Sequence, residues 1–328
     1  MIPPKLKNGD EIRVIAPSRS LSFLSNETRK IAQSRFKNLG LNVSFSKNAE
    51  EIDEFNSSSI KSRVSDLHEA FADKNVKAIF TTLGGFNSNQ LLKHLDYNLI
   101  RKNPKILCGY SDITALSNAI YAKTGLVTYY GPHFSTLGMV KGLDYTIEYL
   151  TKCLFEDSEF EINPSESWSD DPWYMNQEKR KFIKNQGLLT ITEGKAEGLI
   201  IGGNLGTLHL LQGTEFMPSL KDKLLFLEDD ELAKDYTGAT FERCLQSMLQ
   251  LPNSNKLRGL VMGRFQKASE MTPEKINRII NTKKEIKNIP IIANVDFGHT
   301  TPQITFPIGG SARLNATKKG VELKILKH

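Results

Sequence analysis

The segment "KILCGYSDITALSNAI", residues 105–120, carries the pattern that decides the fold. Its apolar run at 106–108 stops at Gly109, and apolar side chains then recur at helical spacing between Ile113 and Ile120. This change of period predicts a strand, a tight turn and a helix, with Ser111 in the turn. A serine there either caps the helix or presents a nucleophilic hydroxyl, and its position alone favours the cap.

Short strands and helices alternate through the first 160 residues. The patterns predict strands within 11–18, 41–46, 76–85, 104–112 and 126–132, and helices at 26–40, 60–73, 89–96 and 112–125. Such alternation predicts an α/β fold with a Rossmann-like, mostly parallel sheet covered by helices on both faces. Ligands bind at the carboxyl ends of the strands in such sheets. Ser18, Gly84, Gly85 and Ser111 all fall at strand ends, so we expect them to converge on one rim.

The character of the chain changes after residue 160. Residues 163–181 are polar and contain both tryptophans, Trp168 and Trp173, which is typical of a long functional loop. Residues 185–328 again mix strands with helices. We therefore predict an N-terminal domain at 1–160, a linker and substrate loop at 161–184, and a mixed α/β C-terminal domain at 185–328.

The bulk composition excludes several classes of protein. The 328 residues carry a formal net charge of +6, but the lysines are scattered, so nucleic acid is not expected as a partner. Three unpaired cysteines argue against a disulfide framework. Neither a signal peptide nor a membrane span is visible, so we expect a cytoplasmic protein without a membrane partner. No metal-binding or nucleotide-phosphate motif is present, so neither a metal nor a cofactor is expected.

A serine nucleophile needs a base and a group that orients the base. Of the six histidines, His133 and His299 each follow a strand and a glycine, which places their imidazoles on loops. The other four lie in helical contexts or at the end of the chain. In "KLLFLEDDEL" an apolar strand ends in acids, and Glu228 comes first after the apolar run. Glu228 could orient a histidine, or the acids could simply form a solvated strand end.

The order of these segments resembles the S66 serine peptidases. The resemblance covers nearly the whole chain and rests on "APS", "TTLGGFNSNQLL", "LCGYSDITAL", "YYGPHF", "GLIIGGNLGTLHLLQGTEFMP", "LLFLEDDE" and "VDFGHTTPQITFPIGG". It implies a triad of Ser111, Glu228 and His299, with His299 and not His133 as the base. Nucleophile and base would then lie on different domains, with the active site in the cleft between them. A homodimer is also implied.

Further site residues follow from the resemblance together with strand-end geometry. The backbone N–H groups of Gly85 and Asp112 are expected to form the oxyanion hole. Gly84, and Asn204 in "GGNLGT", are expected near the substrate, although Asn204 could equally be a left-handed turn residue. In the 163–181 loop, Trp168 is the first candidate and Trp173 the second for stacking on a nucleobase. Either tryptophan could instead fasten the loop to the body.

The resemblance spans two activities. One branch, the microcin C immunity peptidases of MccF type, cleaves peptidyl- or aminoacyl-nucleotide amides, and the tryptophan-bearing loop favours this branch. The alternative is an LD-carboxypeptidase of murein recycling. A non-catalytic binding protein on the same fold is a third interpretation, but binding alone does not require all three triad residues.

Overall fold

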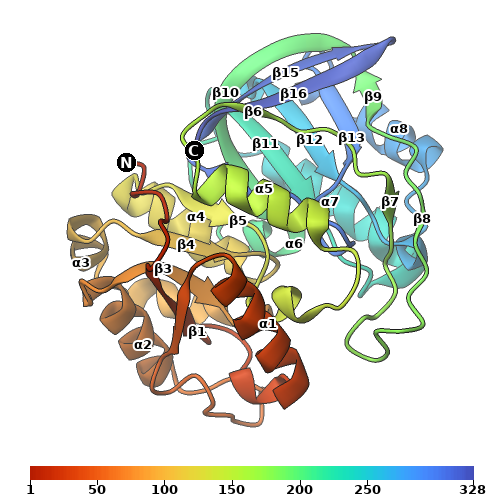
Figure 1. Ribbon diagram of the computed structural model, residues 1–328. Helices are drawn as coiled ribbons and strands as arrows, with labels where there is room; N and C mark the ends of the chain where they lie inside the picture. The colour runs from red at the N-terminus through yellow and green to blue at the C-terminus, as the bar shows by residue number, and fades with distance from the viewer.

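The computed structural model describes residues 1–328 and contains two large sheets (Figure 1). The first has strand order β14-β5-β4-β3-β1-β2. Its strands are β1 (Glu11–Ile15), β2 (Asn42–Phe45), β3 (Val76–Thr81), β4 (Ile106–Gly109), β5 (Thr128–Tyr130) and β14 (Phe306–Ile308). Strands β1 to β5 pair in parallel, which confirms the predicted mostly parallel sheet.

Helices cover both faces of this sheet. They are α1 (Asn26–Asn38), α2 (Ile60–Ala72), α3 (Tyr97–Lys102), α4 (Ile113–Thr124) and α5 (Asp144–Leu154). Core residues of α1 and α5 pack in one hydrophobic cluster, and those of α2, α3 and α4 pack in another. Serine caps begin two of these helices: Ser25 Oγ accepts from Thr28 N at 3.1 Å, and Ser59 Oγ accepts from Ser62 N at 3.0 Å.

The predicted helix at 89–96 is wrong in type. Residues Ser88–His94 form a 3₁₀ helix, and a separate α-helix, α3, begins at Tyr97. Asp96 divides the two because its carboxylate accepts from the backbone N–H groups of Asn98 and Leu99, at 3.0 and 2.9 Å. An N-cap takes extended backbone, so the preceding helix cannot continue through it.

The second sheet has strand order β6-β16-β15-β10-β11-β12-β13-β9. Its strands are β6 (Phe160–Glu161), β9 (Leu189–Thr192), β10 (Gly194–Asn204), β11 (Lys223–Glu228), β12 (Gly259–Gly263), β13 (Ile291–Val295), β15 (Ser311–Thr317) and β16 (Gly320–Lys327). The central strands β10 to β13 are parallel and the outer ones antiparallel, so this sheet is mixed.

Three α-helices belong to the second half. They are α6 (Leu205–His209), α7 (Thr237–Leu249) and α8 (Pro273–Asn281). The remaining 3₁₀ helices are η1 (Leu21–Phe23), η3 (Ser135–Gly138), η4 (Lys234–Tyr236), η5 (Ser254–Lys256), η6 (Lys267–Ser269) and η7 (Lys284–Ile286), with η2 the one at Ser88–His94. None of the helices has the length and apolar character needed to cross a bilayer.

One strand was not foreseen in its sheet. Strand β14, near the end of the chain, leaves the second half and pairs antiparallel with β5 at the edge of the first sheet. Both hydrophobic clusters likewise contain residues from the two sheets, so the cores are continuous. The domain boundaries at 160 and 184 remain a prediction.

The polar segment at 163–187 forms an excursion on one side of the molecule (Figure 1). Within it, β7 (Ser167–Trp168) and β8 (Ile183–Lys184) pair antiparallel as a two-stranded ribbon. The sequence predicted a loop here, and the ribbon gives the two arms of that loop a fixed register.

Candidate active site

The carboxyl ends of β1, β3 and β4 meet at the carboxylate of Asp112. Asp112 Oδ2 accepts from Ser18 Oγ at 2.6 Å and from the backbone N–H groups of Asn87 and Ser88 at 3.1 and 2.9 Å. Parallel strands end at the same edge of a sheet, so one buried carboxylate can join all three loops. The predicted convergence on one rim is confirmed.

Ser111 does not cap helix α4, so the simplest interpretation of its position is wrong. Its φ is +58°, and Asp112 occupies the N-cap position. A capping serine needs extended backbone for its hydroxyl to reach the N2 or N3 amide. The left-handed conformation directs the hydroxyl elsewhere: Ser111 Oγ lies 3.0 Å from Nε2 of His299.

His299 is in turn held by Glu228, the last residue of β11. The two atoms His299 Nδ1 and Glu228 Oε2 are 2.7 Å apart, and Glu228 is fully buried. An ionised carboxylate only accepts hydrogen bonds, so the neutral form of the imidazole carries its proton on Nδ1 and leaves Nε2 to accept from the Ser111 hydroxyl. The His299 side chain is 19% exposed, which leaves the imidazole within reach of a ligand.

Two opposing effects set the pKa of His299. Burial lowers it, because the charged imidazolium loses its hydration. The charge of Glu228 and its hydrogen bond raise it, with smaller contributions from Asp230 and Asp229. The balance raises the pKa of His299 to about 9. The imidazolium that forms when a base accepts a proton is therefore well stabilised here.

Tyr130 is a site residue that the sequence analysis missed. Its hydroxyl donates to Glu228 Oε1 at 2.7 Å, so both oxygens of the carboxylate are satisfied. Burial, followed by the charge of Glu228, raises the pKa of Tyr130 well above its usual value, which keeps the hydroxyl protonated as a donor. A signal existed: Tyr130 ends the strand next to Gly109, and a buried tyrosine normally needs a polar partner.

Gly298 allows Glu228 to approach the loop that carries His299. Its φ is +103°, and a Cβ at this position would lie 2.7 Å from Glu228 Oε2. Both the conformation and the space therefore require glycine. In the short sequence "FGH", Gly298 thus packs against Glu228, and His299 follows directly in the chain.

His133, the other candidate base, does not contact Ser111 or Glu228 by a hydrogen bond. It is buried, its Nδ1 lies 2.7 Å from Thr81 Oγ1, and its ring packs 4.3 Å from that of Tyr110. Burial, and then the positive charge of His299, lower the pKa of His133 to about 3. It is a neutral residue packed beneath the site.

The predicted oxyanion donors lie beside the serine. The backbone N–H groups of Gly85 and Asp112 donate to no group within the protein. A Cβ on Gly84 would come within 2.9 Å of Ser111 Oγ, so this turn lies against the nucleophile. Two amides are thus without an acceptor inside the protein, and their role as an oxyanion hole stays a prediction.

Asn204 lies level with Glu228 on the neighbouring strand. Its φ is −65°, so the left-handed turn interpretation is wrong. Its side chain caps α6 by accepting from Thr207 N at 2.9 Å and donates to Asp229 Oδ1 at 3.3 Å. Burial, and then the charges of Glu228 and Asp230, raise the pKa of Asp229 to about 7. Contact of Asn204 with substrate stays a prediction.

The two tryptophans differ in their surroundings. Trp168 in β7 is faced by the guanidinium of Arg264 at 5.0 Å and the ammonium of Lys267 at 5.3 Å from its ring centroid. Trp173 lies in the loop between β7 and β8, partly exposed, with Tyr174 as its aromatic neighbour at 6.0 Å. The protein's own cations thus occupy Trp168 and anchor it, which leaves Trp173 the freer ring.

Comparison with known proteins decides the family. The sequence profile of the LD-carboxypeptidase N-terminal domain of peptidase family S66 matches residues 12–131, and that of the C-terminal domain matches 197–314. The chain belongs to the S66 peptidase family. It is therefore a hydrolase of the carboxypeptidase type, with the α/β fold of that family.

Similar proteins cover most or all of this S66 member. An MccF-like protein from Bacillus anthracis is 60% identical, and its crystal structure superposes with a TM-score of 0.99 over 100% of both chains. The microcin C7 self-immunity protein MccF of Escherichia coli is 36% identical over 83% of this chain and 80% of its own. A structure of MccF in complex with aspartyl sulfamoyl adenosine matches with a TM-score of 0.89 over 100% of this chain and 99% of the other.

A relative of the other branch is also similar. The "Probable murein peptide carboxypeptidase" of Bacillus subtilis is 31% identical over 97% of this chain and 92% of its own length. Fold and enzyme class therefore follow from the family. The substrate does not, because relatives of both branches match this chain.

Proposed function

We propose that this S66 peptidase is a serine amide hydrolase of MccF type that cleaves peptidyl- or aminoacyl-nucleotide amides. The observation that carries the proposal is the continuous hydrogen-bond path from Ser111 through His299 to Glu228, at 3.0 and 2.7 Å. Three residues from three strand ends have no structural need to align in this way. Their order is that of a nucleophile, a base and the acid that orients the base.

The geometry supports acyl transfer through a covalent intermediate. His299 Nε2 accepts the Ser111 proton while Oγ attacks the scissile carbonyl carbon. The carbonyl oxygen becomes an oxyanion, stabilised by the N–H groups of Gly85 and Asp112. As the tetrahedral intermediate collapses, His299 returns the proton to the leaving nitrogen and the C–N bond breaks. Water, activated by the same histidine, then hydrolyses the acyl-enzyme.

The nucleotide branch is supported by the loop and by the match to MccF. MccF itself is described in complex with aspartyl sulfamoyl adenosine, whose chemistry joins an aminoacyl group to a nucleoside. Trp168 and Trp173 remain the candidates for a base-stacking contact, and the freer ring makes Trp173 the better one. Such a stack typically contributes about 1–3 kcal/mol. Gly84 and Asn204 are proposed to line the substrate at the same rim.

A murein peptide is the second candidate substrate. It is favoured by the full-length similarity to the Bacillus subtilis murein peptide carboxypeptidase. Both branches need the same triad and oxyanion hole, so the chemistry at Ser111 does not distinguish them. The difference must come from contacts to the leaving group.

A paired assay of Ser111→Ala tests the proposal. Wild-type protein should hydrolyse aspartyl sulfamoyl adenosine faster than a murein tetrapeptide, and Ser111→Ala should abolish both activities. Ser117→Ala is the matched control, because the Ser117 hydroxyl is buried in α4 without a hydrogen-bond partner. If Ser111→Ala retains activity, Ser111 is not the nucleophile. If the wild-type protein prefers the tetrapeptide, the substrate is a murein peptide and not a nucleotide amide.

The assembly and location of the protein are further proposals. A homodimer and a cytoplasmic location are both expected from the sequence. Light scattering of the purified protein would measure the oligomeric state, and fractionation of the native host would measure the location.

A further inference from the structure

Ser111 follows a strand of the first sheet, whereas Glu228 ends a strand of the second sheet and His299 follows another. The site therefore functions only if the two sheets keep a fixed position relative to each other.

One direct connection between the two halves of the chain lies along α4. Asn118 donates to the carbonyl oxygen of Gly202 at 2.8 Å and accepts from Gly202 N–H at 3.2 Å. Thr114 Oγ1 accepts from the backbone N–H of Asn204 at 3.0 Å. A second connection comes from the segment at 163–187.

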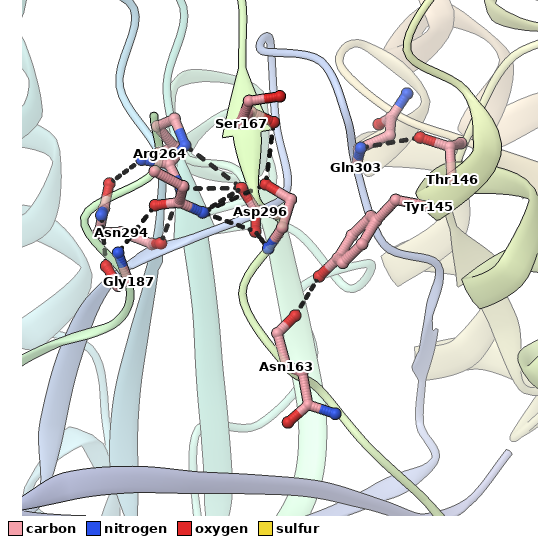
Figure 2. A network of polar contacts seen from close by, with 11 residues as sticks. Tyr145, Thr146, Asn163, Ser167, Gly187, Arg264, Asn294, Asp296 and Gln303 are labelled. Carbon is pink, nitrogen blue, oxygen red and sulfur yellow. Dashed lines mark hydrogen bonds and ion pairs between the residues drawn. The ribbon is translucent and has the colours of Figure 1, made fainter. Parts of the chain in front are cut away.

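The two roots of this segment are fixed to the second half by Asp296. This carboxylate is fully buried, and its Oδ2 accepts from the backbone N–H of Ser165 at 2.7 Å and from Asn185 Nδ2 at 3.3 Å. Ser165 and Asn185 lie before β7 and after β8, so one carboxylate holds both arms. Arg264 Nη2 donates to Asp296 Oδ1 at 2.8 Å and neutralises its charge (Figure 2).

The network extends from Asp296 to both arms of the ribbon. The Arg264 guanidinium faces the ring of Trp168, and its Nη1 donates to Asn294 Oδ1. Asn294 Nδ2 donates to the carbonyl oxygen of Gly187 at 2.5 Å (Figure 2). Beyond the ribbon, Ser169 and Thr301 exchange two backbone hydrogen bonds of 2.8 Å. Because Thr301 is two residues from His299, the segment is attached directly to the histidine loop.

The distal part of the segment is fixed to the first half. Gln177 Nε2 donates to the carbonyl oxygen of Gly138 at 3.0 Å, and Gln177 Oε1 accepts from Val140 N–H at 3.0 Å. Arg180 Nη1 donates to the carbonyl oxygen of Lys141 at 2.8 Å. The segment therefore begins and ends in the second half but is clamped to the first between its two arms.

The clamp leads on to the nucleophile. Phe134 and Ser135, just before the clamped backbone, donate from their N–H groups to Thr81 and Thr82 at 2.9 and 3.0 Å. Thr81 ends β3, whose loop brings Gly84 against Ser111. A continuous series of contacts thus joins the His299 loop, through the segment at 163–187, to the Ser111 turn.

We propose that residues 163–187 form an interdomain strap that holds Ser111 and His299 at reacting distance, with Asp296, Gln177 and Arg180 as positioning residues. The inference rests on the proposed role of Ser111 and His299, and it assigns the strap a part in the chemistry itself. A loop that only contacts the substrate would need neither buried roots nor a clamp on the other half. Misplacing reacting groups by about 1 Å can cost about 100-fold in rate.

The distal clamp offers the cleaner variants. Asp296→Asn would leave Arg264 partly uncompensated in the core, and the protein could fail to fold. Gln177 is only partly buried. Arg180 has Nε and Nη2 buried without partners, so Arg180→Met removes these unsatisfied groups together with the bonds from Nη1 to the carbonyl oxygen of Lys141 and to Met139 Sδ. The test variant is therefore Gln177→Ala/Arg180→Met. Lys179→Ala is the control, since this exposed side chain makes no hydrogen bond or ion pair.

A reagent that lacks both the peptide and the nucleotide part of the substrate separates positioning from substrate binding. Diisopropyl fluorophosphate reacts with an activated serine: the Ser111 Oγ–P bond forms, fluoride leaves, and His299 takes the proton. We expect the second-order rate constant of inactivation to fall at least 10-fold in the double variant and to stay unchanged in Lys179→Ala. With the peptide or nucleotide substrate, kcat should fall more than KM rises. An unchanged inactivation rate would overturn the strap, because the loop would then act only on the substrate.

Two further measurements distinguish a failure of the strap proposal from a failure of the proposed function. Mass spectrometry locates the phosphoryl group, and wild-type protein that is not modified at Ser111 would overturn the proposed function. Hydrogen exchange tests the clamp without any activity: amides at 138–142 and 163–187 should both exchange faster in the double variant. Unchanged protection in both segments would overturn the strap even if Ser111 is the nucleophile. Melting temperatures of all variants identify any general loss of stability.

Discussion

His299 Nε2 lies 3.0 Å from Ser111 Oγ, although 188 positions separate the two residues in the chain and they follow strands of different sheets. The pair is the contact through which the two halves of this S66 peptidase would act as one site. Its geometry depends on the left-handed backbone of Ser111, on Gly298 and on the buried Glu228.

The pH dependence should report the interaction between Glu228 and His299. A general base acts only when neutral, and the pKa of His299 is raised to about 9, so kcat/KM should rise with pH and level off only above that value. In Glu228→Gln the raising charge is lost while burial still lowers the pKa. The midpoint should then fall to 6.5 or below, and the plateau should drop by about 10⁴-fold because the tautomer is no longer fixed. If the midpoint of the pH profile does not change in Glu228→Gln, then Glu228 does not set the pKa of His299.

Adjacent tyrosines provide a matched pair for the role of Tyr130. Tyr130→Phe removes the donor to a buried carboxylate, so stability should fall by about 1.5–3 kcal/mol and kcat/KM should fall with it. Tyr129 is equally buried, but its hydroxyl has no hydrogen-bond partner, so Tyr129→Phe should be neutral or stabilising. Urea denaturation and steady-state kinetics of both variants measure the difference. Equal effects would mean that the bond to Glu228 contributes nothing.

Gly298→Ala should damage the triad more than it damages the fold. The new Cβ would meet Glu228 Oε2 at 2.7 Å in addition to the strain of a positive φ. Gly9→Ala has a similar φ of +90° but open space around its Cβ, so it carries the strain alone. We expect Gly298→Ala to lose activity at least 10-fold relative to Gly9→Ala at comparable melting temperature, because misplaced catalytic groups lose rate steeply. Similar activities in the two variants would contradict the close packing of Glu228 against the loop.

The two tryptophans should respond differently to alanine. Trp173→Ala should raise KM for aspartyl sulfamoyl adenosine by about 5- to 150-fold, the equivalent of a base stack of about 1–3 kcal/mol, and leave a murein tetrapeptide unaffected. Trp168→Ala should mainly loosen the ribbon, because the ring packs under Arg264 and Lys267. Tryptophan fluorescence and substrate kinetics measure both effects. If neither variant changes the preference between substrates, the MccF-type assignment loses its support.

Much of the fold could be predicted from local pattern. The alternating strands and helices, the parallel sheet and the convergence of Ser18, Gly84 and Ser111 all follow from periodicity and from the direction of the strands. Errors arose where a local signal had two physical outcomes. The apolar spacing at 89–96 fits a 3₁₀ helix as well as an α-helix, and the cap at Asp96 separates this segment from α3. Tyr130 was missed because its partner comes from a distant strand.

The sequence alone determined the fold class and the family, and through the family resemblance it predicted Ser111, Glu228 and His299 as the triad, because these inferences depend on local pattern and on the order of segments along the chain. Tertiary structure alone decided that Ser111 presents its hydroxyl to His299 and does not cap α4, and that Trp168 is held by the protein's own cations. It also decided that strand β14 and the segment at 163–187 join the two halves. Such outcomes depend on contacts between residues that lie far apart in the chain, from 39 positions for Gln177 and Gly138 to 188 for Ser111 and His299, and no local propensity encodes those contacts.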